Sequence, residues 1–424
     1  MRTIPLIGCA LLSVNLFMAS NAMASLGPYE HGAGIKSQGA GGISYAFGEE
    51  ATVISANPAI AAALDDRVDV GVNLFIPAPR AEFEGNLFGR NQGYDASGQR
   101  IYPIPQGAFV RHLSEEWTLG VSLFSAGLGP DYEQSPYARF GGASRSSLTL
   151  ISSGAVIAAA WRPREDQALA LSINPGYQII EVKGLQFLQN TLPLLRVSET
   201  PRRTTDQGKD GRYTIGATIG WHGLLAPTIA GGISYRTKTY TQRHKEYRGL
   251  IPDRGRLELP AIWGGGIAWM PIGSLTLAFD FQRFELSDER ALGNPFSRLA
   301  EGHFLGSKDG PGFGLRDQDA YKFGIAWDPV SWLTVRAGYV HATRPTQASD
   351  TLFNILASVN ATTHYTAGFT WAFGRWEITA CYVDIPKVRV EGDGSIPLLF
   401  GGGEASHEFG VTSVGISIGW LLGD

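Results

Sequence analysis

The sequence has 424 residues, a formal net charge of −4, 54 glycines and only 17% charged residues. The nearly balanced charge excludes the strongly basic surface on which nucleic-acid binding depends. Soluble domains usually carry about 25% charged residues. The deficit therefore favours a protein surface that faces lipid rather than water.

Residues 1–24 have the features of a secretory signal peptide. One arginine supplies a positive charge, a short apolar stretch follows, and Ala22 and Ala24 form a small-x-small cleavage site. Cleavage would remove Cys9 and leave Cys381 as the only cysteine, which excludes an intramolecular disulfide. No later run of 18 apolar residues predicts a transmembrane helix. The exported chain is therefore periplasmic, secreted or a β-barrel.

Apolar and polar residues alternate with a period of two along much of the chain. Between residues 275 and 282, four large apolar side chains alternate with Thr276, Ala278, Asp280 and Gln282. This is the pattern of a barrel strand with lipid on one side and a polar or packed lumen on the other. A soluble β-sandwich would also produce the alternation, so it is not sufficient alone.

The number of alternating segments and the lengths of their connections favour the barrel. Short turns and long connections alternate along the chain, which is the layout of an outer-membrane barrel. Only the connection near 249–255 is short where a long loop is expected. The fourteen segments lie near 66–76, 104–113, 117–126, 147–162, 167–187, 211–222, 227–248, 256–270, 275–286, 320–328, 332–344, 363–373, 375–390 and 406–421.

The tryptophans predict which rim lies at the periplasmic interface of the membrane. Nine of the ten flank the short turns or end the last segment, and only Trp263 lies elsewhere. Indole rings prefer the membrane interface because they combine an apolar body with an N–H group. The sequence therefore predicts an aromatic girdle on the rim with the short turns.

Residues 25–65 do not alternate and are rich in glycine and alanine. They could form a disordered tail or a plug inside the lumen. A barrel of about 14 strands is too wide to be filled by its own side chains, which leaves room for a plug. We therefore divide the chain into a signal peptide (1–24), an N-terminal hatch (25–65) and a transmembrane antiparallel β-barrel (66–424).

Several motifs, in order along the chain, resemble the FadL/TodX family of outer-membrane transporters for long-chain fatty acids and other hydrophobic compounds. The small-residue stretch 38–46 and the run Asn57, Pro58 and Ala59 resemble the hatch of that family. Further similar segments lie at 120–129, 259–261, 275–280 and 332–339. The set is specific because its order is kept over nearly the whole mature chain.

The resemblance implies an all-β, 14-stranded barrel closed by a hatch. It implies uptake of a hydrophobic small molecule, with a gate at Asn57, Pro58 and Ala59. The ligand would leave sideways through the wall at a kinked third strand, where Gly127, Gly129 and Pro130 can interrupt the hydrogen-bond ladder. We expect a monomer surrounded by outer-membrane lipid and lipopolysaccharide, with no cofactor and no nucleic acid.

Two departures from the family pattern concern the ends of the strands. The chain continues beyond Trp420 instead of ending on an aromatic residue, and the short connection at 249–255 puts a loop-formed capture groove in doubt. Substrate capture could use apolar residues of the preceding loop instead, or these could pack a loop helix. They are Leu185, Phe187, Leu188, Leu192, Leu194 and Leu195.

Three basic residues occupy strand positions whose side chains should point into the lumen, namely Arg212, Lys322 and Arg336. They could pair with a substrate carboxylate, or with inward acids and the hatch. The run 415–419 matches the hydrolase nucleophile elbow, but it lies inside a strand and no histidine follows it. The histidines have no metal-ligand spacing. We therefore predict no catalytic residue and no metal site.

Two other functions compete with uptake of hydrophobic compounds. A general aqueous porin would have a charged constriction and an inward-folded loop instead of a hatch. A lipid-modifying barrel enzyme would need a serine and histidine pair on its lipid face, and the sequence has none. Which hydrophobic compound is carried does not follow from these residues.

Overall fold

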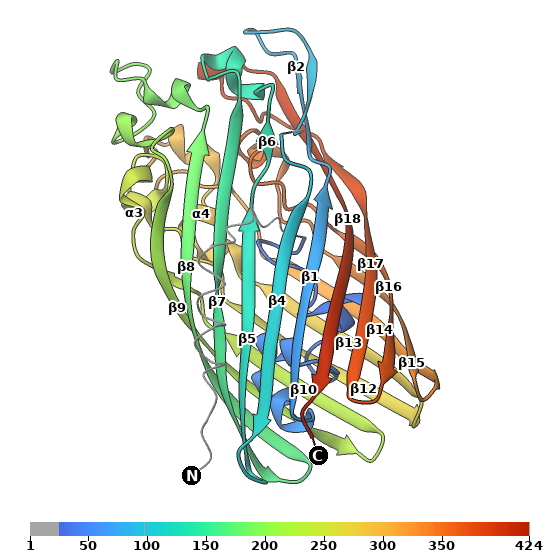
Figure 1. Ribbon diagram of the computed structural model, residues 1–424. Helices are drawn as coiled ribbons and strands as arrows, with labels where there is room; N and C mark the ends of the chain where they lie inside the picture. Colours follow the sequence, from blue (N-terminus) through green and yellow to red (C-terminus); the bar gives the residue numbers. More distant parts are fainter. Residues whose placement is uncertain (1–24, 97, 424) are drawn as a thin grey trace.

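The computed structural model describes residues 25–96 and 98–423, which form a closed antiparallel β-barrel (Figure 1). The predicted signal peptide lies outside these residues. The predicted number of fourteen strands is confirmed. The wall consists of β1 (Arg67–Pro77), β4 (Tyr102–His112), β5 (Trp117–Leu128), β7 (Ser146–Arg164), β8 (Gln167–Lys183), β9 (Asp210–Ala226), β10 (Ile229–Arg236), β12 (Ile262–Ile272), β13 (Leu275–Phe284), β14 (Gln318–Val330), β15 (Leu333–Ala342), β16 (Thr363–Phe373), β17 (Trp376–Val390) and β18 (Glu404–Leu421).

The first and last strands close the barrel. β1 pairs with β18 over its whole length, from Arg67 opposite Leu421 to Pro77 opposite Val411. The other edge of β1 pairs with β4. Neighbouring strands are antiparallel around the barrel, and closure pairs edges that would be costly in lipid; only β4 and β5 are paired over a small part of their length.

The two rims of the barrel differ as predicted. Tight turns such as 165–166 and 374–375 lie on one rim, and the long connections lie on the other. The long connections contain β2 (Arg80–Glu84), β3 (Gln92–Asp95), β6 (Asp131–Tyr132), β11 (Tyr240–Thr241), α3 (Pro252–Gly255), α4 (Arg290–Gly293), α5 (Thr351–Asn354), η3 (Pro136–Phe140), η4 (Gln186–Gln189), η5 (Pro201–Arg203), η6 (Lys245–Tyr247), η7 (Leu286–Asp288), η8 (Phe296–Leu299), η9 (Ala348–Asp350) and η10 (Leu398–Phe400). Within the described residues, no helix is long and apolar enough to cross a membrane.

The outer face of the barrel is apolar, as the alternation predicts. On β8, Leu171 is 60% exposed and Ile173 is 53% exposed, whereas the intervening Ser172 is buried. Large aliphatic and aromatic side chains point outward on the other strands as well. This outer face accounts for the low content of charged residues.

The tryptophans other than Trp263 lie on the rim with the short turns. Trp117 and Trp161 are paired across β5 and β7 and stack with ring centroids 6.4 Å apart. Trp376 and Trp420 stack in the same way across β17 and β18, at 5.5 Å. All four are exposed on the outside of the barrel, where their N–H groups can reach the polar edge of a membrane.

One predicted connection is wrong. The strands predicted at 227–248 and 256–270 are shorter, so the connection between β10 and β12 runs from 237 to 261 and is not a short loop at 249–255. β10 ends early because the Thr237 hydroxyl, rather than a backbone carbonyl, accepts the hydrogen bond from the Ala217 N–H. The charged stretch 243–248 then forms a helical turn. This rim therefore has a long loop at every position where one was expected.

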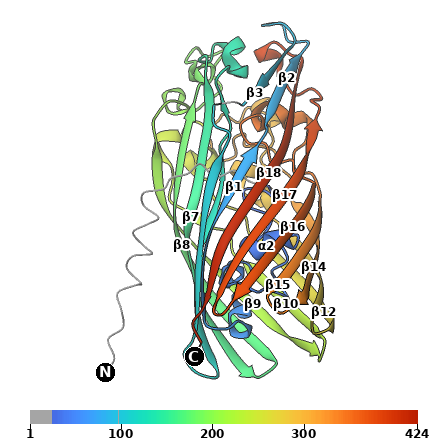
Figure 2. The ribbon, with the colours of Figure 1, turned by 45° about the vertical axis from the view of Figure 1, so that its right-hand side comes forward.

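Residues 25–65 lie inside the barrel, as Figure 2 shows for α2 (Ile35–Gly39). We refer to this part of the chain as the hatch segment. α2 contacts β15, β16 and β17, while η1 (Ala51–Ser55) and η2 (Pro58–Ala63) contact β5, β7 and β9 on the opposite wall. Most of these residues are buried. The hatch segment therefore spans the lumen from one wall to the other.

Glycines on the inner face of the wall allow the hatch segment to approach closely. A Cβ atom on Gly232 would lie 1.8 Å from the carbonyl oxygen of Tyr45, and one on Gly338 would lie 2.1 Å from the backbone nitrogen of Gly41. Both contacts are with backbone, which cannot rotate away as a side chain could. The high glycine content therefore has a packing reason at these positions.

Candidate functional site

Two neighbouring strands of the wall separate halfway along their length. β4 pairs with β5 only from Ala108–His112, although β5 remains paired with β7 as far as Leu128. In the described structure, residues 102–107 and 123–128 face each other without ladder hydrogen bonds. The unpaired stretch is six residues long, or about 20 Å of strand. We refer to it as the wall gap.

The residues at the wall gap explain why the pairing fails. The predicted kink residues Gly127, Gly129 and Pro130 lie at its end near the long loops, where β5 stops before β6. On the facing strand, Pro103 and Pro105 have no N–H to donate, which confines proline to strand edges. The pairing of β5 with β4 ends at Ser122, which is nearer the start of β5 than the predicted kink at Gly127.

The start of the hatch segment occupies part of the free edge of β5. The backbone N–H of Gly127 donates to the carbonyl oxygen of Pro28 at 2.8 Å. Tyr29 and Ala126 form an isolated antiparallel bridge. Residues 26–29, which we refer to as the N-terminal latch, thus replace β4 as the partner of β5 over a short distance.

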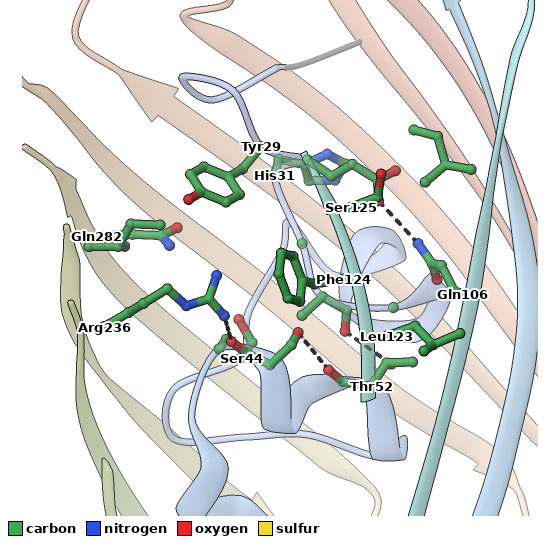
Figure 3. Close-up of a pocket in the computed structure, with 18 of the residues that line it drawn as sticks. Tyr29, His31, Ser44, Thr52, Gln106, Leu123, Phe124, Ser125, Arg236 and Gln282 are labelled. Atoms are coloured by element: carbon green, nitrogen blue, oxygen red, sulfur yellow. Dashed lines mark hydrogen bonds between the residues drawn. The ribbon is translucent and has the colours of Figure 1, made fainter. Parts of the chain in front are cut away.

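A cavity of about 100 Å³ lies between the wall gap and the hatch segment (Figure 3). Both edges of the wall gap line it, through Ile104 to Gln106 on β4 and Leu123 to Ser125 on β5. Arg236 and Gln282 line the opposite side, and Tyr29 and Ser44 of the hatch segment complete it. Polar and apolar groups both face this space, which we refer to as the polar cavity.

The acid of the polar cavity is held by two amide side chains. Asn73 and Gln106 each donate to the carboxylate of Glu30, the latter at 3.3 Å. Burial raises the pKa of Glu30 to about 6, and these two hydrogen bonds act in the opposite direction.

The predicted gate residues link the hatch segment to the wall. Asn57 accepts a hydrogen bond from the backbone N–H of Ala59 at 3.1 Å, and Pro58 is the first residue of η2. The Asn57 amide donates to the carbonyl oxygens of Tyr45 at 2.8 Å and Trp221 at 2.9 Å. One buried side chain therefore joins two parts of the hatch segment to β9. That these residues act as a gate is still a prediction.

The three predicted cations lie in different environments. Lys322 lines the polar cavity and donates to the carbonyl oxygens of His31 at 2.7 Å and Gly42 at 3.3 Å. Arg336 is buried and forms an ion pair of 2.7 Å with Glu49. Both side chains therefore bind the hatch segment, which was the alternative to binding substrate.

Arg212 is not part of this group. It lies near the rim with the long loops, where it pairs with Asp210 at 2.7 Å and donates to the carbonyl oxygen of Arg243. Its guanidinium is partly exposed to solvent. Arg212 does not line either of the cavities described here.

A second cavity, of about 60 Å³, lies nearer the long loops and has an almost wholly apolar lining. We refer to it as the apolar cavity. Leu148 and Leu150 on β7 and Ile180 and Val182 on β8 form one side of it. The connections between strands supply the other side. Its lining residues include Leu250, Ile251, Leu257, Leu305, Phe313, Phe353 and Leu356.

The predicted capture residues separate into two sets. Leu185 lines the apolar cavity, Leu188 is fully buried, and Phe187 packs against Tyr137 with ring centroids 5.8 Å apart. The remaining leucines, at 192, 194 and 195, are exposed on the loop surface. The structure therefore divides one apolar stretch into a cavity wall and an outer surface.

Residues of the site that the sequence analysis missed come from long-range contacts. Arg236 and Tyr29 line the polar cavity, and Pro103 and Pro105 border the wall gap. The two prolines carried a usable signal, because proline inside an alternating segment indicates a strand edge. Among residues 25–96 and 98–423, no group of three or more His, Cys, Asp or Glu side chains is arranged to hold a metal ion.

Comparisons with known proteins agree with this architecture. Residues 22–384 match the sequence profile of the outer membrane protein transport protein family (OMPP1/FadL/TodX). The toluene transporter TodX of Pseudomonas putida has a similar structure, with a TM-score of 0.67 and 17% identity, over 95% of this chain and 100% of that chain.

Two further solved structures have the same fold. The toluene transporter TbuX of Ralstonia pickettii gives a TM-score of 0.61 and 15% identity, over 91% of this chain and 98% of that chain. A FadL homologue of Pseudomonas aeruginosa gives 0.66 and 15%, over 96% and 100%. No curated protein sequence matches this chain. The profile match over most of the chain shows that it belongs to the OMPP1/FadL/TodX family of outer-membrane transport proteins.

Proposed function

We propose that this protein takes up hydrophobic small molecules, either hydrocarbons or long-chain fatty acids, across the outer membrane. The observation that carries the proposal is the pair of cavities, one lined by the long loops and the other by both edges of the wall gap. A ligand would enter the apolar cavity from outside, pass to the polar cavity, and leave sideways between β4 and β5. The toluene transporters with the same fold support this substrate class.

The apolar cavity provides the first stage of this route. Its lining has no charged side chain, so an apolar molecule can bind there without competing for polar groups. An engineered cavity of about 150 Å³ is known to hold benzene. The apolar cavity of about 60 Å³ is smaller, so the loops around it must move outward when a ligand binds.

The wall gap provides the exit. Hydrogen bonds between strands must be broken before a molecule can leave a closed barrel sideways, and each broken bond in lipid is costly. At the wall gap those bonds are already missing. The N-terminal latch and the rest of the hatch segment would act as the gate, and a lateral route would deliver an apolar ligand to the membrane without crossing water.

A general aqueous porin is less well supported. The hatch segment binds strands on both sides of the lumen through Asn57, Lys322 and Arg336. A water-filled channel through the barrel would need these contacts to be absent or broken. Planar-bilayer recordings are therefore informative, because a large steady current from the intact protein would favour a porin.

Uptake can be tested directly in cells that lack their own transporters of this kind. Cells that express the protein should accumulate radiolabelled toluene or oleate faster than cells that carry an empty vector. A variant with Leu123→Trp places a bulky ring at the edge of the wall gap, where Leu123 lines the polar cavity, and we expect it to slow uptake. Leu171→Trp on the lipid face of β8 is the matched control. Equal uptake with and without the protein would overturn the proposal.

A further inference from the structure

Part of the connection between β10 and β12 covers the apolar cavity. It includes α3, which lies among the long loops (Figure 1). We refer to residues 250–257 as the cavity lid. Arg254 and Arg256 are exposed on its outer side. Its inner side chains are apolar, and four of them line the apolar cavity, namely Leu250, Ile251, Pro252 and Leu257. The cavity lid therefore separates the apolar cavity from the solution above the loops.

The backbone of the cavity lid is strained at its turn. Asp253 and Arg254 have φ angles of 49° and 56°, and Gly255 follows with 98°. This left-handed region suits glycine, is tolerated by aspartate, and is unfavourable for other residues that carry a Cβ atom. Among the described residues, Asp206 is the only other non-glycine residue with a positive φ. Two such residues in succession indicate that the surrounding contacts impose the shape of the turn.

Two backbone hydrogen bonds to a neighbouring loop hold the strained turn. The N–H of Asp253 donates to the carbonyl oxygen of Ser307 at 2.8 Å, and the N–H of Arg254 donates to the carbonyl oxygen of Gly306 at 3.0 Å. These bonds and the burial of the apolar side chains favour the closed lid, whereas the backbone strain opposes it. The closed lid is therefore a balance between opposing effects.

The two ends of the cavity lid are anchored. Just before it, the buried Tyr247 hydroxyl donates to the carbonyl oxygen of Gly208 at 2.6 Å and accepts from the N–H of Val182 at 3.1 Å. Just after it, the buried Glu258 pairs with Lys238 at 2.8 Å. The cavity lid can therefore swing outward between two fixed points while the rest of the connection stays in place.

We propose that the cavity lid opens the apolar cavity to the outside, and that the left-handed turn at Asp253 and Arg254 favours this opening. The inference rests on the proposed uptake function and adds an entry step to it. Once the bonds to Gly306 and Ser307 break, the turn can relax. The strain that is released offsets part of the cost of exposing the apolar side chains, so the cavity can widen to admit a ligand.

Hydrogen exchange measures opening of the lid in the full chain, held in lipid nanodiscs. In the closed lid, the amides of Asp253 and Arg254 are protected by their bonds to the neighbouring loop. Arg254→Gly removes a Cβ atom from a left-handed position and so favours the closed lid. We expect exchange in residues 250–257, corrected for the intrinsic rate of each sequence, to slow at least fivefold.

Arg254→Ala is the matched control for this substitution. It loses the same exposed, charged side chain but keeps the Cβ atom, so the strain remains. Its exchange in residues 250–257 should equal that of the wild type. The heat-modifiable migration of the barrel on gels checks that both variants are folded.

Toluene connects the lid to uptake. Saturating toluene should speed exchange in residues 250–257 of the wild type at least threefold, because the ligand displaces the lid. Cells that express Arg254→Gly should take up radiolabelled toluene at least threefold more slowly than cells that express the wild type, because each molecule must wait for the lid to open. Cells that express Arg254→Ala should match the wild type.

The other outcomes separate the lid from the proposed function. Equal exchange in Arg254→Gly and Arg254→Ala would overturn the role of the strained turn. Exchange that toluene leaves unchanged, or uptake by Arg254→Gly at the wild-type rate, would overturn the lid itself. In each of these cases, wild-type uptake above the empty vector leaves the proposed function standing. Wild-type uptake no faster than the empty vector would reject the proposed function.

Discussion

The backbone N–H of Gly127 donates to the carbonyl oxygen of Pro28 at 2.8 Å, so the first described residues of the chain bind a strand of the barrel wall. This contact lies where β5 has lost its pairing with β4. A few residues of the N-terminal latch therefore cover an edge that would otherwise be unpaired. If these residues moved away, this part of the edge of β5 would be left without the hydrogen bond from Gly127 to Pro28.

A disulfide across the N-terminal latch should close the wall gap reversibly. Tyr29 and Ala126 face each other in an antiparallel bridge, a spacing that suits a disulfide. We expect the oxidised Tyr29→Cys, Ala126→Cys double variant to lose at least tenfold in uptake rate, because the latch can no longer leave β5. A reducing agent should restore uptake. Each single variant serves as the control, and unchanged uptake by the oxidised double variant would contradict the gating role.

Substitution of Gly338 should displace the hatch segment. The added Cβ of Gly338→Ala would lie 2.1 Å from the backbone nitrogen of Gly41, and overpacking of this kind typically costs about 1–3 kcal/mol. We expect faster hydrogen exchange in residues 38–44. Gly273→Ala is the control, because its Cβ would meet no atom within 4 Å. Exchange that is the same in both variants would show that the contact is not tight.

Removal of the Asn57 side chain should loosen the hatch segment from β9. Asn57→Ala removes the cap of η2, worth about 1 kcal/mol. It also leaves the carbonyl oxygens of Tyr45 and Trp221 without this donor. Hydrogen exchange at the Ala59 amide should rise, and brief openings should appear in planar-bilayer recordings. Asn190→Ala, which removes a similar side-chain to backbone hydrogen bond from an exposed loop, should produce neither effect.

The long loops should become less stable as the pH rises through the range of one buried acid. Burial raises the pKa of Glu289 from 4.5 to about 7; Lys238 opposes this shift and Glu258 adds to it. The folded loop therefore binds a proton more tightly than the unfolded loop. Its stability is highest below about pH 4.5 and falls between there and about pH 7.

Limited proteolysis of the loops between pH 4.5 and pH 8 measures this effect. In the wild type, cleavage within residues 285–317 should accelerate as the pH rises. Glu289→Gln should remove that dependence, because the neutral amide resembles the protonated acid. Glu301→Gln changes an exposed acid of the same loop and should leave the profile unaltered. A pH profile that is the same in the wild type and in Glu289→Gln would refute the prediction.

The wall of the barrel could be predicted from local pattern alone. On β8, the alternation of Leu169, Leu171 and Ile173 with small residues predicted which side chains face lipid, and the structure agrees. The tryptophans beside short turns predicted the rim. These predictions succeed because the side-chain period of a strand is two residues and the membrane acts on each strand separately.

The prediction failed where a strand ends against a distant segment. The stretch 237–248 has the composition of a strand, yet β10 ends at Arg236 because the Thr237 hydroxyl replaces a backbone carbonyl as the acceptor for the Ala217 N–H of β9. The side chains of Lys322 and Arg336 were correctly predicted to point into the lumen. The alternation alone could not tell whether their partner is a substrate or the hatch segment. That choice depends on residues almost 300 positions away in the chain.

Residue order by itself therefore determined the number of strands, the lipid-facing side chains and the rim that carries the tryptophans, because each follows from neighbours two or four residues apart. Tertiary structure alone decided that β4 and β5 separate at Ser122, that Pro28 binds Gly127, and that Arg236 donates to the carbonyl oxygen of Ser55. These features depend on which distant groups compete for the same hydrogen bonds and the same space once the barrel closes around the hatch segment.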